Sequence, residues 1–256
     1  MYSYLEQHEF QEITNKLIDL IPLIQTIKYP LDIYALNFGI KYDNFAIAIA
    51  CLQDFFDYMI EANLALFEME AAYKYYNKVK LNNQNKQLKV IYTRFHAENV
   101  FLRLYSACEH IANYLMYLYN IKYKDLKKIV KKRDALSVKV GLYFSKNRPK
   151  SLITKKLNQL ISNNSWKYCL EYRNNWVHNQ RKLIKGIPSR YNRKSRWEKD
   201  GGGFKIFIKY NGDIPETSIE ELMEYSHSSF KIVYQTMKSI ILYTVRVKIN
   251  TKMSRI

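Results

Sequence analysis

The chain has 256 residues, of which 48% are hydrophobic and 15% aromatic, enough for a packed core and too many for an intrinsically disordered chain. Only seven glycines and five prolines interrupt it, a composition that favours long helices over a turn-rich β architecture. Its formal net charge is +18, from 41 Lys and Arg against 23 Asp and Glu, which directs attention to polyanionic partners.

Three cysteines, Cys51, Cys108 and Cys169, lie far apart in the sequence and show no zinc-binding spacing. They indicate free thiols in a reducing compartment. The amino terminus lacks the basic and apolar regions of a signal peptide, and the longest apolar run, at residues 45–52, is too short to cross a membrane. We therefore expect a soluble cytoplasmic protein without metal, cofactor or membrane contact.

The first half of the chain shows apolar residues at helical spacing in three segments. The first covers residues 6–23 and ends near prolines, and the second runs from about residue 43 to residue 80. A polar link at 82–86 separates it from a third helix at about 88–119. Two of the three segments are thus predicted to be long helices.

Shorter elements are predicted next. A basic segment occupies residues 123–133, and two short helices lie on either side of Pro149. A further helix, at about 165–185, ends at a glycine followed by a proline, the usual order of residues after a helix.

The last part of the chain changes character. Residues 189–210 have a glycine-rich centre and then alternate apolar and polar residues, which predicts a β-hairpin projecting from a helical body. A final helix at about 217–247 opens with Thr217 and Glu220, the spacing of a capping box.

The predicted fold class is therefore all-α with one small hairpin. We expect a single domain over residues 1–256. Its predicted parts are an N-terminal helical extension at 1–42, a helical bundle at 43–185 and 214–250, and a basic β-hairpin insertion at 186–213, before the last helix.

The positive charge is concentrated in one third of the chain. Residues 122–209 contain 25 Lys and Arg against 5 Asp and Glu, a net charge of +20, and the remainder carries a net charge of −2. A chain rich in Lys and Asn can simply reflect an AT-rich genome, but that would spread the charge evenly. The concentration favours a polyanion-binding surface.

An arginine interrupts the apolar stripe of the helix predicted at 165–185. On a helical wheel, Arg173 lies among apolar residues, beside a polar stripe that includes Asn174, His178 and Arg181. A buried guanidinium needs either an acidic partner or a groove that admits an anion. Glu109, on the apolar face of another predicted helix, is a candidate partner. An ordinary buried ion pair beside a solvated histidine would explain the same pattern.

The segment from Arg173 to His178, RNNWVH, matches the pattern R-N-x-x-x-H and in this respect resembles the HEPN superfamily of helical RNA-cleaving domains. The motif lies late in a helical chain, after a long helix with an acidic residue among apolar ones and before another long helix. The resemblance covers about residues 43–247. It implies a HEPN-like helical bundle that cuts RNA without a metal ion.

The resemblance also implies roles for individual residues. His178 would act as general base or acid, and Arg173 would hold the scissile phosphate. Asn174 would orient the imidazole of His178. Glu109 and Arg181 would support the site, Arg181 by following the RNA backbone.

HEPN nucleases work as homodimers whose motifs face each other across a cleft. On one ideal helix, Arg173 and His178 are separated by about 140°, so one phosphate does not easily meet both from a single chain. A second subunit would bring its own pair to the same cleft. We therefore expect a homodimer.

Other cations form two groups, one on a single side of the short basic segment and one beside Tyr191 and Trp197 in the predicted hairpin. Cations interleaved with aromatic residues suit single-stranded RNA, although each group could equally be a solvated basic surface. The expected RNA-binding residues are Lys127, Lys128, Lys131, Lys132, Lys185, Arg190, Arg193, Lys194 and Arg196.

The sequence thus predicts a metal-independent endoribonuclease, of the kind used as a toxin or an antiviral effector, with RNA as substrate and an antitoxin or similar neutralising protein as partner. Two alternatives stay open. One is a non-catalytic RNA-binding module, and the other is a helical scaffold that docks an acidic protein.

Overall fold

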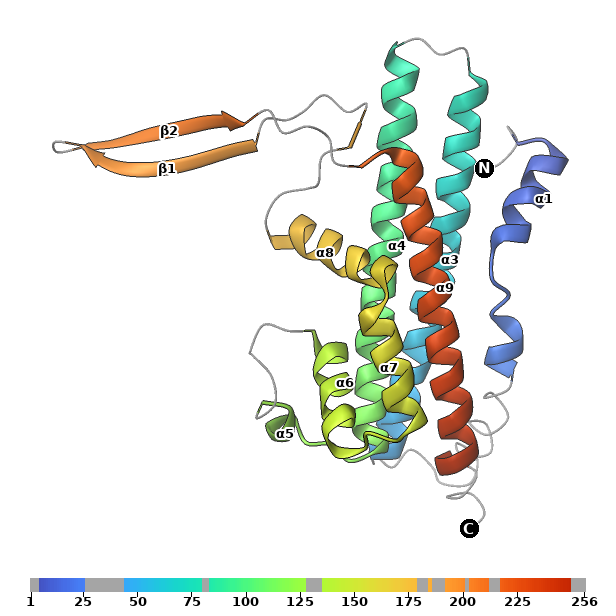
Figure 1. Cartoon of the computed structure of the whole chain (residues 1–256). Helices are drawn as coiled ribbons and strands as arrows, with labels where there is room; N and C mark the ends of the chain where they lie inside the picture. Colours follow the sequence, from blue (N-terminus) through green and yellow to red (C-terminus); the bar gives the residue numbers. More distant parts are fainter. Residues whose placement is uncertain are drawn as a thin grey trace.

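The computed structural model describes residues 5–25, 44–79, 83–127, 135–178, 184–185, 192–200, 203–211 and 217–249. Most of these residues are helical, so the predicted helical architecture is confirmed at this coarse level. In Figure 1 the helices form one elongated body, and the two strands extend away from it. No helix in the described ranges is long and apolar enough to cross a membrane.

Two long helices, α3 (Asn44–Lys78) and α4 (Asn83–Leu118), form an antiparallel pair along the body (Figure 1). At one end the rings of Tyr76 and Tyr92 stack with their centroids 5.6 Å apart, and at the other Asn44 Nδ2 donates to Asn120 Oδ1 at 2.7 Å. Asn120 has a φ of 54°, a left-handed conformation that asparagine tolerates and that commonly follows a helix. The prediction of two long helices is confirmed, but α4 begins inside the predicted polar link.

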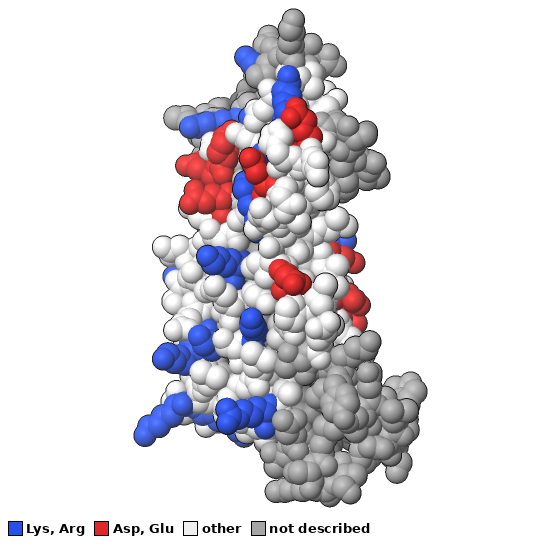
Figure 2. All heavy atoms as spheres, turned by 90° about the vertical axis from the view of Figure 1, so that its right-hand side faces the viewer, with Lys and Arg blue, Asp and Glu red and all other residues white. Residues whose placement is uncertain are grey.

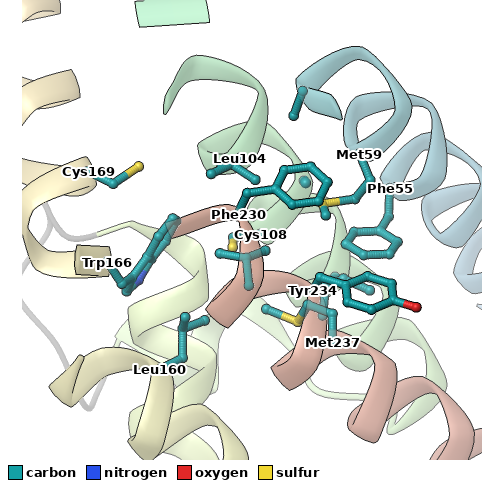
Figure 3. Packing of buried hydrophobic residues seen from close by; sticks show 14 of the residues in the cluster. Phe55, Met59, Leu104, Cys108, Leu160, Trp166, Cys169, Phe230, Tyr234 and Met237 are labelled. Atoms are coloured by element: carbon teal, nitrogen blue, oxygen red, sulfur yellow. The ribbon is translucent and has the colours of Figure 1, made fainter. Parts of the chain in front are cut away.

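The helix α9 (Ile219–Thr244) completes the central bundle and continues as a short π-helix, η1 (Val245–Ile249). The core lies where α3, α4 and α9 meet, and α7 (Leu152–Ser162) and α8 (Asn164–His178) close it on one side. Figure 3 shows side chains from all five helices turned toward one another, among them Phe55, Met59, Leu104, Cys108, Leu160, Trp166, Cys169, Phe230, Tyr234 and Met237.

The N-terminal segment is broken into two pieces. The helix α1 covers Gln7–Lys16, and a second helical turn covers residues 21–25, so the predicted continuous helix at 6–23 is wrong. Leu17 adopts an extended conformation after α1. The second piece starts at Ile21, whose N–H donates to Asp19 Oδ1 at 2.9 Å. Pro22 falls in its first turn, where a missing N–H costs nothing.

Ion pairs hold α1 against α3. Lys78 Nζ lies 2.6 Å from the Glu9 carboxylate, and Lys16 Nζ lies 2.8 Å from that of Glu70. Glu70 is buried, and its other oxygen accepts a hydrogen bond of 2.8 Å from Nε2 of His227 on α9. Ile13 of α1 is fully buried against Phe67 and Ala71 of α3.

Shorter helices follow α4 in the sequence: α5 (Tyr123–Lys127), α6 (Leu136–Asn147) and α7. The helices α6 and α7 lie on either side of Pro149, so the two short helices predicted there are confirmed. The helix α8 ends at His178, and Ile184 forms a parallel bridge with Thr217 instead of continuing the predicted helix to residue 185. The isolated bridge lies beside the first turn of α9 (Figure 1).

The strands β1 (Asn192–Asp200) and β2 (Gly203–Asn211) pair antiparallel. After them, the N-cap of α9 is Ser218, whose hydroxyl accepts from the Glu221 N–H while the Glu221 carboxylate accepts from the Ser218 N–H. The predicted capping box at Thr217 and Glu220 is therefore displaced by one residue. Thr217 forms the bridge with Ile184 instead.

Candidate functional site

The helix α8 carries the candidate motif and is anchored by its first half. Asn163, just before it, accepts a hydrogen bond from the Trp166 N–H at 3.1 Å through its side chain, which satisfies a free donor of the first turn. Trp166, Cys169 and Tyr172 follow at intervals of three residues and are buried. The position of α8 is thus fixed by one buried edge that faces the core.

A tyrosine pair joins α8 to α9. The rings of Tyr168 and Tyr225 stack with centroids 3.9 Å apart and an interplanar angle of 9°. The Tyr168 hydroxyl is hydrogen-bonded to Thr217 Oγ1 at 3.2 Å, and burial raises the pKa of Tyr168 to about 12. This contact ties α8 to the residue that forms the bridge with Ile184.

A buried polar group joins α8 to α4. The Glu98 carboxylate accepts hydrogen bonds from Arg94 Nε at 2.8 Å and from the Tyr172 hydroxyl at 3.0 Å. Burial, and then the charge of Glu98, raise the pKa of Tyr172, so its hydroxyl stays protonated and donates. Within the described residues, Nη2 of Arg94 is buried without a hydrogen-bond partner.

Arg173 directly follows Tyr172 and lies over the ring of Tyr105 on α4, with Cζ 3.9 Å from the ring centroid. Its Nη1 donates to Asn174 Oδ1 at 3.1 Å. Its Nε is buried and has no hydrogen-bond partner in the described part of the chain. The guanidinium is therefore held by an aromatic ring and an amide, neither of which neutralises its charge.

The expected ion pair between Arg173 and Glu109 does not form, although both residues are described. The Glu109 carboxylate instead accepts two backbone hydrogen bonds of 3.0 Å each, from the N–H groups of Leu136 and Ser137. These groups open α6, where unpaired N–H donors and the helix dipole favour a negative charge. Glu109 therefore caps α6, and no other carboxylate in the described ranges pairs with Arg173.

His178 is the last residue of α8, and Asn174 is exposed one turn before it. His110, next to Glu109 in the sequence, lies against α3, with its Nδ1 3.2 Å from the Asp54 carboxylate. The structure thus brings Arg173 and Asn174 into direct contact and places His178 at the end of the same helix.

The other predicted residues are spread over the molecule. Lys127 is exposed at the end of α5, 5.4 Å from the ring of Tyr123, and Lys185 is exposed in a turn after the bridge. Arg193, Lys194 and Arg196 belong to β1. Five predicted residues lie outside the described part of the chain: Lys128, Lys131, Lys132, Arg181 and Arg190.

Two features of the site were not predicted from the sequence: Tyr105, and the group formed by Arg94, Glu98 and Tyr172. The spacing of Arg94 and Glu98, four residues apart on a predicted helix, was a usable signal for an ion pair. The place of Tyr105 beneath Arg173 depends on how two helices cross, and a single sequence contains no signal for it.

Comparison of the chain with family models, with curated proteins and with solved structures gave no match. The resemblance to HEPN domains therefore rests on the motif and its surroundings in this chain. Among the described residues, no group of three or more His, Cys, Asp or Glu side chains is arranged to hold a metal ion.

Proposed function

We propose that this protein is a metal-independent endoribonuclease with a HEPN-like bundle, and that Arg173 and His178 of its R-N-x-x-x-H motif carry out the reaction. The observation that carries the proposal is the state of Arg173. Its guanidinium lies half-buried on the motif helix, with no carboxylate partner among the described residues.

An arginine in this state is suited to hold an anion. A half-buried guanidinium without an anionic partner keeps hydrogen-bond donors available for phosphate oxygens. Stacking on Tyr105 fixes the plane of the guanidinium, so less conformational entropy is lost when it binds a phosphate. An arginine serving only the fold would be expected to pair with the nearby Glu109, whose carboxylate is committed to α6.

The proposed reaction is a transesterification followed by product release. A base takes the proton of the ribose 2′-hydroxyl, whose oxygen attacks the neighbouring phosphorus. The bond to the 5′-oxygen breaks, and that oxygen receives a proton. The products are a 2′,3′-cyclic phosphate and a 5′-hydroxyl end. His178 serves as the base or the acid, and Arg173 stabilises the charge that grows on the phosphate.

Two subunits are part of the proposal. Arg173 and His178 lie five residues apart on α8, so a single helix directs them about 140° apart. A homodimer with facing motifs would supply Arg173 from one subunit and His178 from the other to the same phosphate. A fully active monomer in size-exclusion chromatography with light scattering would contradict this arrangement.

The cellular role follows from the resemblance alone. Proteins of this kind serve as toxins or antiviral effectors, so cellular RNA is the proposed substrate and a neutralising antitoxin the proposed protein partner. The exposed Lys127 and Lys185, with Arg193, Lys194 and Arg196 of β1, are proposed to contact RNA outside the cleavage site.

The test uses purified protein and end-labelled RNA in buffer with EDTA. Wild type is expected to produce fragments that end in a 2′,3′-cyclic phosphate. His178→Ala is expected to abolish cleavage and retain RNA binding, and Arg173→Ala is expected to lower the rate by about 10²-fold or more. Lys167→Ala, an exposed cation on the same helix, is the matched control and should cut like wild type.

The outcomes separate the proposal from its alternatives. Binding without cleavage by wild type would identify an RNA-binding module. Neither binding nor cleavage would favour a scaffold for an acidic protein. Thermal unfolding of each variant shows whether a loss of activity reflects a loss of fold.

A further inference from the structure

The charges of α9 are separated along its axis. Its first turns carry Glu220, Glu221 and Glu224, whereas residues 225–249 contain no Asp or Glu at all. Among the side chains of this second part whose exposure is described, the exposed cations are Lys231 and Lys238 on α9 and Arg246 on η1, spaced seven and eight residues apart and thus on one side of the continuous helix. They form a row about 22 Å long, at about 1.5 Å per residue.

The neighbouring elements extend this row. Residues 135–170 contain no Asp or Glu, and the corner between α6 and α7 presents the exposed cations Arg148, Lys150 and Lys155. The helix α7 packs against α9. Figure 2 shows this separation: carboxylates gather at the upper left of the face, and the charged residues at the lower left are Lys and Arg. We call the six residues Arg148, Lys150, Lys155, Lys231, Lys238 and Arg246 the basic face.

No carboxylate neutralises the basic face within the described residues. The interhelical ion pairs of the described chain join α1 to α3, α3 to α4, or the first half of α9 to α3 and α4. Arg148 lies over the ring of Tyr119 and Lys238 near that of Tyr234, at 4.8 and 5.6 Å, contacts that leave both charges unpaired. Six like charges without counter-charges make this side of the bundle strongly attractive to a polyanion.

We infer that the basic face is a second RNA-binding surface, which holds the phosphate backbone of a substrate that extends beyond the cleavage site. This inference rests on the proposed function, because it names the RNA as the one that the motif cleaves. If the inference holds, the affinity for RNA depends on the length of the substrate. A long RNA would contact both α8 and α9, whereas an oligonucleotide of a few residues would contact only the motif.

The apolar residues of α9 favour RNA over a membrane surface. A helix that binds a membrane inserts an exposed apolar face between the lipids. The apolar side of α9 is already used by the core, where Val233, Met237, Ile240 and Ile241 are buried. A phosphate backbone requires only the cations, which release counterions when they meet it.

The test measures RNA affinity against salt concentration in the His178→Ala background, so that the RNA stays intact. The probe is a fluorescent single-stranded RNA of about 30 nucleotides, long enough to span several binding sites of the usual size. The variant is the double substitution Lys231→Gln and Lys238→Gln. Each lost phosphate contact should reduce the magnitude of the slope of log affinity against log salt by about 0.7. The slope of the double variant should therefore be smaller in magnitude by about 1.4.

At 0.15 M salt, this change of slope corresponds to an affinity about tenfold weaker. Two controls are matched to the variant. The double substitution Lys231→Arg and Lys238→Arg keeps the charge and should keep the slope. Lys86→Gln removes an exposed charge from α4, outside the basic face, and should leave the slope unchanged. A six-nucleotide RNA should bind the parent and the double glutamine variant equally, since it is expected to be too short to reach both surfaces.

Each result decides the inference. An unchanged slope in the double glutamine variant refutes it, even if wild type cuts RNA, and so does a parent that binds no RNA. Binding to phosphatidylserine vesicles that depends on Lys231 and Lys238, with RNA binding unaffected, would identify a membrane surface instead. A reduced slope in a protein that never cuts RNA would support the basic face and refute the nuclease proposal.

Discussion

The substitution Glu109→Ala distinguishes two roles for this carboxylate. If Glu109 neutralised Arg173, its removal would leave a half-buried guanidinium unpaired and would disturb the motif helix. The structure instead places both Glu109 oxygens on the backbone N–H groups of Leu136 and Ser137. The substitution should then weaken α6 and leave Arg173 unaffected.

The expected size follows from these contacts. Loss of a side chain that caps a helix costs about 0.5–2 kcal/mol. Loss of a negative charge from a helix N-terminus costs about 0.3–1 kcal/mol more. Because Glu109 supplies both to α6, Glu109→Ala should lower the free energy of unfolding by about 2 kcal/mol.

The assay is a double-mutant cycle in urea. The free energy of unfolding is measured for wild type, Glu109→Ala, Arg173→Ala and the double variant. Residues without a shared contact have effects that add within about 0.5 kcal/mol, so the interaction energy between Glu109 and Arg173 should stay below that value. Cleavage by the folded fraction of Glu109→Ala should equal that of wild type.

Two results would refute this reasoning. An interaction energy well above about 1 kcal/mol would mean that the two charges form a pair in solution. A loss of cleavage in Glu109→Ala that exceeds its unfolded fraction would assign Glu109 to the site itself, as the sequence predicted.

Two further predictions concern stability. Burial opposes ionisation of Glu70, but hydrogen bonds from His227 and Lys16 outweigh burial and lower its pKa. A carboxyl with a lowered pKa stabilises the fold above its ordinary pKa of about 4.3, and this contribution is lost as the pH falls through the folded value. Wild type should therefore lose more stability between about pH 5 and pH 3 than Glu70→Gln, as measured by urea unfolding at each pH; equal losses would contradict the assignment. Ser218→Ala should lower the free energy of unfolding by about 1 kcal/mol, because it removes the N-cap of α9. A cost close to zero in thermal and urea unfolding would show that the cap lies elsewhere.

Much of the fold was predictable because long apolar stretches without glycine or proline leave few alternatives to helices. The errors lie at the ends of helices, where two local signals compete. Thr217 and Ser218 are each followed three residues later by a glutamate, so the sequence contains two overlapping capping boxes. Ser218 is used because Thr217 forms a bridge with Ile184 and bonds to Tyr168, which no local pattern reveals.

The end of α8 illustrates the same limit. The helical spacing of apolar residues continues past His178 to Ile184, which led to a predicted helix reaching residue 185. Ile184 is indeed buried, but it is buried as a bridge residue beside Thr217. Periodicity identifies which residues are buried more reliably than it identifies the backbone that buries them.

At the site, the partner of each charged residue could not be predicted without the three-dimensional structure. The sequence predicted that both Arg173 and Glu109 lie among apolar residues, and pairing them was the simplest way to satisfy two charges. The backbone donors of α6 also required a partner, and in the structure they bond to both oxygens of Glu109. The basic face was missed for a related reason. A charge count over residues 219–246 cancels Glu220, Glu221 and Glu224 against Lys231, Lys238 and Arg246, although the fold keeps the two groups apart along α9 and η1 and joins the cations to those of α6 and α7. The unpaired arginine and the basic face both follow from where carboxylates of the described residues are used: Glu109 caps α6, and the interhelical ion pairs join α1, α3, α4 and the first half of α9.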